Sequence, residues 1–241
     1  MLKTNKSIKT KVVGRQSIAF WSPFSDGSTT CAIEYAKALS KQYDANVALV
    51  ELDMLHPSFE IYFPSNTGGF KEILRADRID RITFENIKNA AIQNDFDVYK
   101  NYFSYIDLFN INMTIMEKVL TMIISMYDFV IFDTNRNFDN KLTDLALRLS
   151  DRVIIPIKPS PLEIDLLNKY LDIFEDHQEW SVLKCAALIN QYQANHPTYL
   201  DIEKALKASV IGYIKHEKQA SISKTMSKEF VKIADKEVRI K

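Results

Sequence analysis

The stretch that decides the fold is Trp21-Ser22-Pro23-Phe24-Ser25-Asp26-Gly27-Ser28-Thr29-Thr30. The segment before it, residues 17–21, is a short continuous apolar run, which is typical of a strand buried on both faces. The segment after it, residues 28–41, has the i, i+3 and i+4 apolar spacing of a helix that packs on a sheet, at Cys31, Ala32, Tyr35, Ala36 and Leu39. The sequence therefore predicts a strand, a loop and a helix in direct succession.

The rest of the chain repeats this alternation. Further apolar, β-rich runs lie at residues 47–50, 129–132, 153–157, 183–188 and 210–213. Side chains that cap helices predict helix starts between them, at Thr114 with Glu117, at Ser160 with Pro161 and Glu163, and at Thr198 with Asp201. We therefore expect an α/β fold, with a mostly parallel sheet and helices on both of its faces.

Residues 65–112 are irregular, and the sequence assigns no strands there. Gly68 and Gly69 open a short helix-like piece, and aromatic residues follow at Phe96, Tyr99, Tyr102, Phe103, Tyr105 and Phe109. We expect these aromatics to form a packed satellite core, with a protein-binding face as the alternative. Because no repeat or linker divides the chain, we expect one domain over residues 1–241, with an N-terminal extension at 1–15 and a basic C-terminal segment at 214–241.

The composition excludes several classes of protein. Hydrophobic residues make up 46% and charged residues 26%, which excludes disordered and coiled-coil chains. The 31 basic residues balance the 31 acidic ones, so no global field attracts nucleic acid or an anionic membrane. Cys31, Cys185 and the four histidines show no metal-ligand spacing. Since no apolar run has the length of a membrane span and none follows the N-terminal lysines, we expect a cytoplasmic protein.

The opening loop has the order and part of the composition of a phosphate-binding P-loop. Such a loop needs glycines so that backbone amides can wrap the phosphates, a lysine to neutralise them and a hydroxyl for magnesium. Gly27 and Thr29 are in place, and the amides near Thr29 and Thr30 begin a helix, which favours anions. The alternative at this stage is an ordinary capped turn between a strand and a helix.

These residues resemble the loop of the ParA/MinD family of deviant Walker A ATPases, which are SIMIBI-class P-loop proteins, and most closely its CpaE/TadZ-like pilus-assembly branch. In that family the loop reads K-G-G-x-G-K-T-T. Aligned on Gly27-Ser28-Thr29-Thr30, the chain has Pro23 for the early lysine, Phe24 and Ser25 for two glycines, and Ser28 for the late lysine. The P-loop is therefore degenerate, because both of its lysines are replaced.

Downstream segments extend the resemblance over most of the chain. Residues 47–53, followed by His56-Pro57-Ser58, are similar to the family's second strand and switch region. Residues 127–134 are similar to its Walker B strand, and residues 151–157 look like the strand that comes next. Residues 187–190 resemble the strand whose asparagine reads the adenine edge.

The resemblance implies a set of site residues. Nucleotide contacts would come from Gly27, Ser28, Thr29, Thr30 and Asn190, and magnesium ligands from Thr29, Asp53 and Asp133. Glu51, Asp53 and Asp133 are the candidates for catalysis. Without the resemblance, the same residues have ordinary structural explanations. Glu51 and Asp53 would be solvated carboxylates at a strand end, Asp133 would cap a loop, and Asn190 would form a turn at the end of its strand.

The missing lysines predict weak binding of ATP or ADP with magnesium, or none. A charge-assisted hydrogen bond contributes about 1.5 to 3 kcal/mol, so losing two lysines removes about 3 to 6 kcal/mol. Affinity would then fall about a hundredfold to ten-thousandfold relative to an intact loop. Hydrolysis should suffer more, because cations stabilise the transferring phosphoryl group and Asp26 adds a negative charge where a phosphate approaches. We therefore expect a pseudo-ATPase.

The resemblance implies a non-catalytic or weakly nucleotide-binding protein that positions or assembles a pilus or secretion machine. It implies a homodimer whose further partner is the machine's motor ATPase or an inner-membrane component. The expected location is the cytoplasm, including the inner face of the membrane or the cell pole. Because Pro23 replaces the lysine that reaches the phosphates of the partner subunit, we expect a dimer that forms without nucleotide.

Two other functions remain open at this stage. One is a weakly active ParA/MinD-type ATPase in plasmid or chromosome partition or in division-site placement, with magnesium on Asp53 and Asp133. The other is a DNA- or membrane-surface-binding module, since residues 204–241 contain ten basic and four acidic residues. The ordinary interpretation of that basic segment is a solvated helix face.

Overall fold

The computed structural model describes residues 10–11, 14–24, 26–64, 70, 73, 82–101, 111–176, 181–216 and 222–237. Its main strands are β2 (Gln16–Phe20), β4 (Val47–Glu51), β5 (Ile92–Gln93), β6 (Asp97–Tyr99), β7 (Phe129–Asp133), β8 (Arg152–Ile157), β9 (Cys185–Tyr192) and β10 (Ser209–Lys215). Its helices are α1 (Ser28–Gln42), α2 (Phe59–Tyr62), α4 (Phe84–Asn89), α6 (Met113–Met126), α7 (Lys141–Leu149), α8 (Pro161–Asp176), α9 (Tyr199–Ala205) and α10 (Ile222–Glu237). A short 3-10 turn, η2 (Val182–Lys184), precedes β9.

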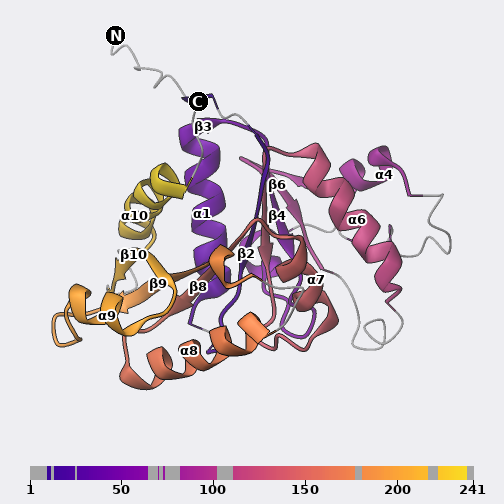
Figure 1. The fold of residues 1–241 in the computed structure, drawn as a ribbon. Helices are drawn as coiled ribbons and strands as arrows, with labels where there is room; N and C mark the ends of the chain where they lie inside the picture. Colours follow the sequence, from indigo (N-terminus) through magenta and orange to yellow (C-terminus); the bar gives the residue numbers. More distant parts are fainter. Residues whose placement is uncertain are drawn as a thin grey trace, which may run out of the picture.

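The main strands form one eight-stranded sheet in the order β10-β9-β8-β2-β7-β4-β6-β5 (Figure 1). The neighbours pair in parallel, except for β5 and β6, which are antiparallel. A separate parallel pair joins β1 (Thr10–Lys11) to β3 (Tyr43–Asp44). The expectation of a mostly parallel α/β sheet is therefore confirmed.

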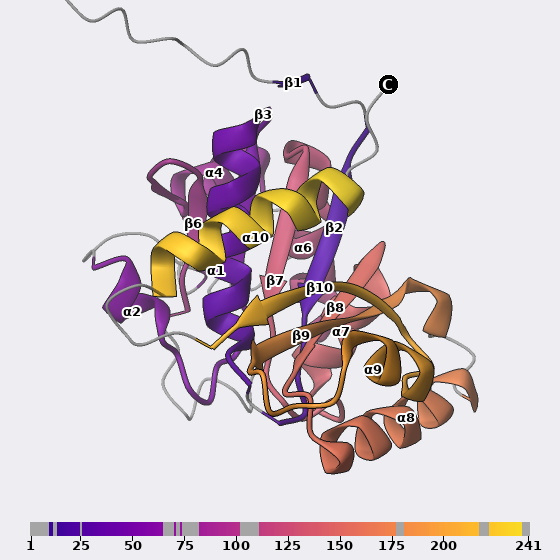
Figure 2. The same cartoon turned by 90° about the vertical axis from the view of Figure 1, so that its left-hand side faces the viewer.

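Both faces of the sheet are buried, which explains the continuous apolar runs. Along β2, Ala19 lies in one hydrophobic cluster, with side chains of α6, α7 and α8, while Ile18 and Phe20 lie in the other, with those of α1 and α10. Figure 2 shows α10 crossing α1 on one side of the sheet. Helices therefore cover both faces, as the sequence predicts.

One predicted helix start is wrong. Asn112, not a capping box at Thr114, begins α6, because the Asn112 Oδ1 accepts hydrogen bonds from the amides of Thr114 at 3.1 Å and Ile115 at 3.3 Å. The other two starts are confirmed. Ser160 Oγ accepts from the Glu163 amide, and Thr198 Oγ1 accepts from the Asp201 amide.

The irregular region contains the short strands β5 and β6, which the sequence does not predict. Phe96 and Tyr99 are buried, as expected for a packed core, and Tyr99 stacks on Phe70 with ring centroids 5.8 Å apart. The remaining aromatics of the cluster and the two glycines lie outside the described residues: Tyr102, Phe103, Tyr105, Phe109, Gly68 and Gly69. None of the described helices combines the length and the apolar character needed to cross a membrane.

Candidate functional site

The loop between β2 and α1 lies at the edge of the sheet where parallel strands end, which is where open α/β sheets bind ligands. Gly27 precedes α1 with φ of 81°, in the left-handed region. A Cβ atom there would lie 3.2 Å from Nδ2 of Asn190. The Cys31 amide donates to the Gly27 carbonyl at 2.9 Å, which starts the helix. Both the backbone and its neighbour therefore favour glycine at this position.

Asp26 does not turn its charge toward a phosphate, so that expectation is wrong. Its side chain is 1% exposed, and the residue does not line the pocket described below. One carboxylate oxygen lies 2.7 Å from Nζ of Lys158, which follows β8, so the charge is neutralised inside the protein. Asn190 Nδ2 donates to the Asp26 carbonyl at 2.7 Å. Asp26 thus ties the loop to the ends of β8 and β9.

Glu163 lies beside the same aspartate. Burial, followed by the interaction with the Asp26 side chain, raises the pKa of Glu163 to about 7, although the Lys158 amide and ammonium oppose this shift. The second buried oxygen of Asp26 has no hydrogen-bond donor in the described structure. A proton held on Glu163 at neutral pH is a donor suited to that oxygen.

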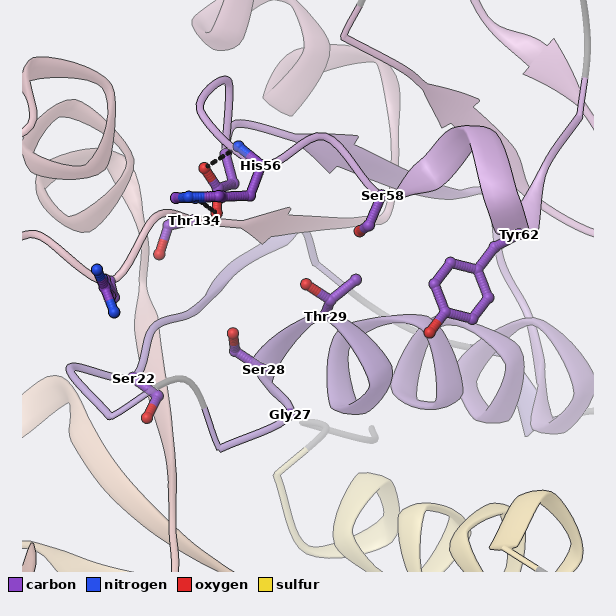
Figure 3. A pocket seen from close by; sticks show the side chains of 10 residues that line it. Ser22, Gly27, Ser28, Thr29, His56, Ser58, Tyr62 and Thr134 are labelled. Atoms are coloured by element: carbon purple, nitrogen blue, oxygen red, sulfur yellow. Dashed lines mark hydrogen bonds and ion pairs between the residues drawn. The ribbon is translucent and has the colours of Figure 1, made fainter. Parts of the chain in front are cut away.

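A pocket of about 360 Å³ opens beside the loop (Figure 3). Ser28 and Thr29, at the start of α1, face Thr134, His56 and Ser58 across it. The described residues that line it are rich in hydroxyl groups: Ser22, Gly27, Ser28, Thr29, Asp53, His56, Ser58, Tyr62, Thr134 and Arg136. The pocket can therefore donate many hydrogen bonds to an anionic ligand.

Asp133 ends β7 behind Thr29. It is 1% exposed, and neither of its carboxylate oxygens has a hydrogen-bond partner in the described structure. Burial raises its pKa well above the usual range, the charges of Glu51 and Asp53 raise it further, and the nearby Thr29 hydroxyl opposes them. A buried acid with only the Thr29 hydroxyl nearby to oppose the effect of burial is costly to ionise, so this carboxylate is suited to a ligand that neutralises it.

Asp53 and Glu51 have different surroundings. Asp53 lines the pocket, and its Oδ1 accepts from the amides of Leu55 and His56 and, at 2.7 Å, from Asn135 Nδ2. Glu51 is 1% exposed and its oxygens accept from three backbone amides: Ser58, Phe59 and Asn101. Burial raises the pKa of Glu51 while these amides lower it. Glu51 therefore holds α2 and the end of β6 together, whereas Asp53 is available to the pocket.

The other sequence candidates divide in the same way. Ser28 and Thr29 line the pocket, and Thr30 lies one residue further along α1 without lining it. Asn190 is 6% exposed, and both ends of its amide are used inside the protein, by the Asp26 carbonyl and the Gln191 amide. In this structure Asn190 supports the loop.

The sequence analysis assigns no role to three of the residues that line the pocket: Ser22, Tyr62 and Arg136. No local motif marks Arg136, which lies three residues beyond the acid that ends β7. Within the described residues, no three His, Cys, Asp or Glu side chains group to hold a metal on their own. Magnesium at Asp133 would therefore also need the Thr29 hydroxyl, water and phosphate oxygens, which suits its preference for few protein ligands.

Solved structures share this fold. A ParA family ATPase from Chlorobium tepidum TLS matches with a TM-score of 0.74 and 17% identity, over 93% of this chain and 92% of that chain. MinD from Pyrococcus horikoshii OT3, complexed with Mg-ADP, matches with 0.74 and 12% identity, over 93% and 96%. A putative plasmid partition protein from Borrelia burgdorferi B31, bound to AMPPNP, matches with 0.64 and 21% identity, over 92% and 97%.

No curated protein sequence matches the chain. Residues 26–184, well over half of the 241, match the AAA domain family AAA_31. The match begins in the loop at Asp26 and extends past β8 and α8, so it includes both Asp53 and Asp133. The chain therefore belongs to the AAA_31 family of AAA domains and has the P-loop fold of the ParA and MinD proteins.

Proposed function

We propose that this protein is a ParA/MinD-type positioning protein that binds a magnesium nucleotide weakly and hydrolyses it slowly or not at all. One observation carries the proposal: the Asp133 carboxylate is buried beside Thr29 with both oxygens unpartnered. Thr29, Asp53 and Asp133 fit a magnesium ion that carries phosphate, and the amides that start α1 fit the phosphate itself. Bound magnesium would supply positive charge to the phosphates and to Asp133.

The weakness of binding follows from the loop. Pro23, Phe24 and Ser28 stand where the family has two lysines and a glycine, so the described loop offers amides and hydroxyls but no lysine to the pocket. A transferring phosphoryl group depends most on cations, so turnover should be affected more than binding.

The proposal is tested by ligand-induced stabilisation. Mg-ADP at millimolar concentration should raise the thermal midpoint of the native chain, because a ligand that binds only the folded state stabilises it. Asp133→Asn should abolish that shift. Asp139→Asn, at an exposed carboxylate in the loop after β7, should keep it. Equal shifts for the native chain and Asp133→Asn would reject the role of Asp133.

For the biological role we infer the CpaE/TadZ-like one, in which the protein places or assembles a pilus or secretion machine. Its support is the degenerate loop, which suits a scaffold better than a motor. The partners of that role would be a motor ATPase or an inner-membrane component at the membrane face or cell pole. Co-purification of such a partner with the native chain would support this role, and co-purification of a DNA-bound centromere-binding protein would contradict it.

A weak ATPase in partition or division-site placement is the second candidate. The observation that favours it is that Thr29 and Asp53 line the same pocket and that Asp133 lies buried beside Thr29. ATP turnover that Asp133→Ala abolishes would support this candidate. If the purified chain hydrolyses no ATP, even together with its partner, this candidate is excluded.

The basic C-terminal segment supports a third candidate, a surface that binds DNA or an anionic membrane. Lys228, Lys232 and Lys236 are exposed and lie four residues apart on α10, so they share one face. Such binding would fall steeply with salt and would be lost when the three lysines are replaced by alanine. An affinity for DNA or anionic vesicles that does not change with salt concentration would exclude this candidate.

A further inference from the structure

We propose that Arg136 supplies the positive charge that the P-loop has lost, by binding the phosphates of a nucleoside diphosphate or triphosphate in the pocket beside Thr29. This inference rests on the proposed function, because it assigns a residue to the same nucleotide site. It moves the phosphate-binding cation from the loop after β2 to the loop after β7.

The first support is the position of Arg136. Its side chain lines the pocket together with Ser22, Ser28 and Thr29. Trp21 Nε1 donates to the Arg136 carbonyl at 3.0 Å, which fixes the main chain of one loop to the other. Arg136 therefore projects from a held backbone.

The residues on both sides of Arg136 hold the loop as well. Asn135 Nδ2 donates to Asp53 Oδ1 at 2.7 Å, and the Asn137 amide donates to Asn135 Oδ1 at 2.9 Å. The Thr134 hydroxyl donates to the Phe20 carbonyl at 2.9 Å. Because these bonds connect the loop to β2 and to Asp53, the main chain of Arg136 keeps its place relative to the start of α1, and its exposed side chain is free to reach a ligand in the pocket.

The second support is the balance of charge around the pocket. Arg136 is the one permanently charged cation among the described lining residues, and its guanidinium forms no ion pair within the described part of the chain. Lys158 forms an ion pair with Asp26, and Nδ1 of His56 lies 3.6 Å from Oδ2 of Asp53. The free arginine and the unpartnered Asp133 are complementary to a phosphate and its magnesium ion, respectively.

The chemistry of arginine suits this role. A guanidinium presents a rigid fork of N–H donors that binds two phosphate oxygens at once, and it stays charged at every physiological pH. One arginine can therefore replace part of what two lysines supply. The remaining deficit leaves binding weak, in agreement with the proposed function.

A double-mutant cycle measured by calorimetric titration of Mg-ADP tests the inference. Arg136→Ala should weaken binding about 10- to 100-fold, as expected for a charge-assisted hydrogen bond. Arg136→Lys should retain more affinity than Arg136→Ala, because it keeps the charge and the main-chain contacts. Arg148→Ala, which removes an arginine of α7 that pairs with Asp144, should bind like the native chain.

Ser28→Lys restores the late lysine and supplies the second arm of the cycle. In that background Arg136→Ala should cost less than about threefold, because the lysine then neutralises the same phosphates. If Arg136→Ala weakens Mg-ADP binding as much in the Ser28→Lys background as in the native chain, Arg136 does not replace the lysine, since independent cations contribute additively. Thermal unfolding of each variant confirms that it is folded.

The remaining outcomes separate the two claims. If Arg136→Ala binds like the native chain while Asp133→Asn does not bind, the inference fails and the proposed function stands. If neither the native chain nor Ser28→Lys binds Mg-ADP, the proposed function fails and the inference fails with it.

Discussion

At the scale of single residues, the site combines side chains that serve the fold with side chains that have no structural partner. Glu51, Asn190 and Asp26 belong to the first group, because each makes hydrogen bonds or ion pairs that hold loops in place. Asp133 and Arg136 belong to the second. Arg136 is exposed and water can hydrate it, whereas the buried Asp133 carboxylate is unusual, and a ligand at this edge of the sheet is our proposed explanation for it.

Asp133 should reduce the stability of the ligand-free protein. Its pKa is raised, so ionisation at neutral pH is harder in the folded chain than in the unfolded one, and stability falls as pH rises above the usual carboxyl range. Asp133→Asn removes that charge and should increase the free energy of unfolding by about 1 kcal/mol or more, measured by urea at pH 7. The exposed Asp139→Asn should change it by less than about 0.5 kcal/mol. A destabilised Asp133→Asn would contradict this account.

Glu163 should make stability depend on pH near neutrality. Its pKa is raised to about 7, so the folded chain holds a proton that the unfolded chain releases near pH 4 to 5. This contribution is complete below the unfolded pKa and is lost as pH rises to about 7 and above. Thermal midpoints between pH 5 and 8 should fall less for Glu163→Gln, which keeps a donor beside Asp26. If the thermal midpoints of the native chain and of Glu163→Gln fall equally with pH, Glu163 holds no proton beside Asp26 in the folded chain.

At the scale of elements, the loop before α1 owes its shape to one glycine. Gly27→Ala should destabilise the chain by about 1 to 2 kcal/mol through left-handed strain, and more through the contact with Asn190. Gly14 is a matched control, because its φ is 102° but nothing lies within 4 Å of a Cβ there. Gly14→Ala should therefore cost less in chemical denaturation. Equal losses would mean that Asn190 does not press on the loop.

The C-terminal helix should be a structural part of the domain. Phe230 of α10 is fully buried, and its ring lies 6.0 Å from that of Tyr35 in α1. Phe230→Ala should cost about 3 to 5 kcal/mol of unfolding free energy, because the cavity lies between two helices. Val231→Ala, at a half-buried neighbour, should cost clearly less. A native-like Phe230→Ala would indicate that α10 docks loosely.

The elements also show what the sequence could predict. Each of the six apolar runs contains a strand, because strands of a covered sheet are rich in apolar residues, but residues 183 and 184 of the fifth run belong to η2. β5 and β6 have two and three residues, which is too short for a periodic pattern, so the sequence does not predict them. The capping pattern at Thr114 and Glu117 predicted the start of α6 two residues too late, because the Asn112 side chain caps the helix in the folded chain.

The strand-end positions of the site candidates could be predicted from the sequence, but their surroundings could not. Asp53 lines the pocket, whereas Asp133 is buried beside Thr29, and their binding of a ligand stays a prediction. The charge of Asp26 depends on Lys158, which is 132 residues away in sequence, so local patterns could not show that it is neutralised. Arg136 carries no motif, and its proximity to the P-loop arises from the pairing of β2 with β7.

At the scale of the whole molecule, we predict a homodimer that forms without nucleotide. The early lysine that would link two subunits through phosphate is Pro23, so other contacts must hold them. Exposed Leu55, Ile61 and Tyr62 beside the pocket are available for this contact. Analytical ultracentrifugation should show a dimer in the absence of nucleotide, and Ile61→Asp should weaken it. A monomer at high concentration would contradict this prediction.

We propose that the pocket binds a magnesium nucleotide. The decisive measurement is calorimetric titration of ADP into the native chain, with magnesium and then with EDTA. With magnesium we predict a Kd between about 10 µM and 1 mM, or about −7 to −4 kcal/mol, and in EDTA binding at least about tenfold weaker. No heat under either condition, or the same affinity in EDTA, would contradict the claim.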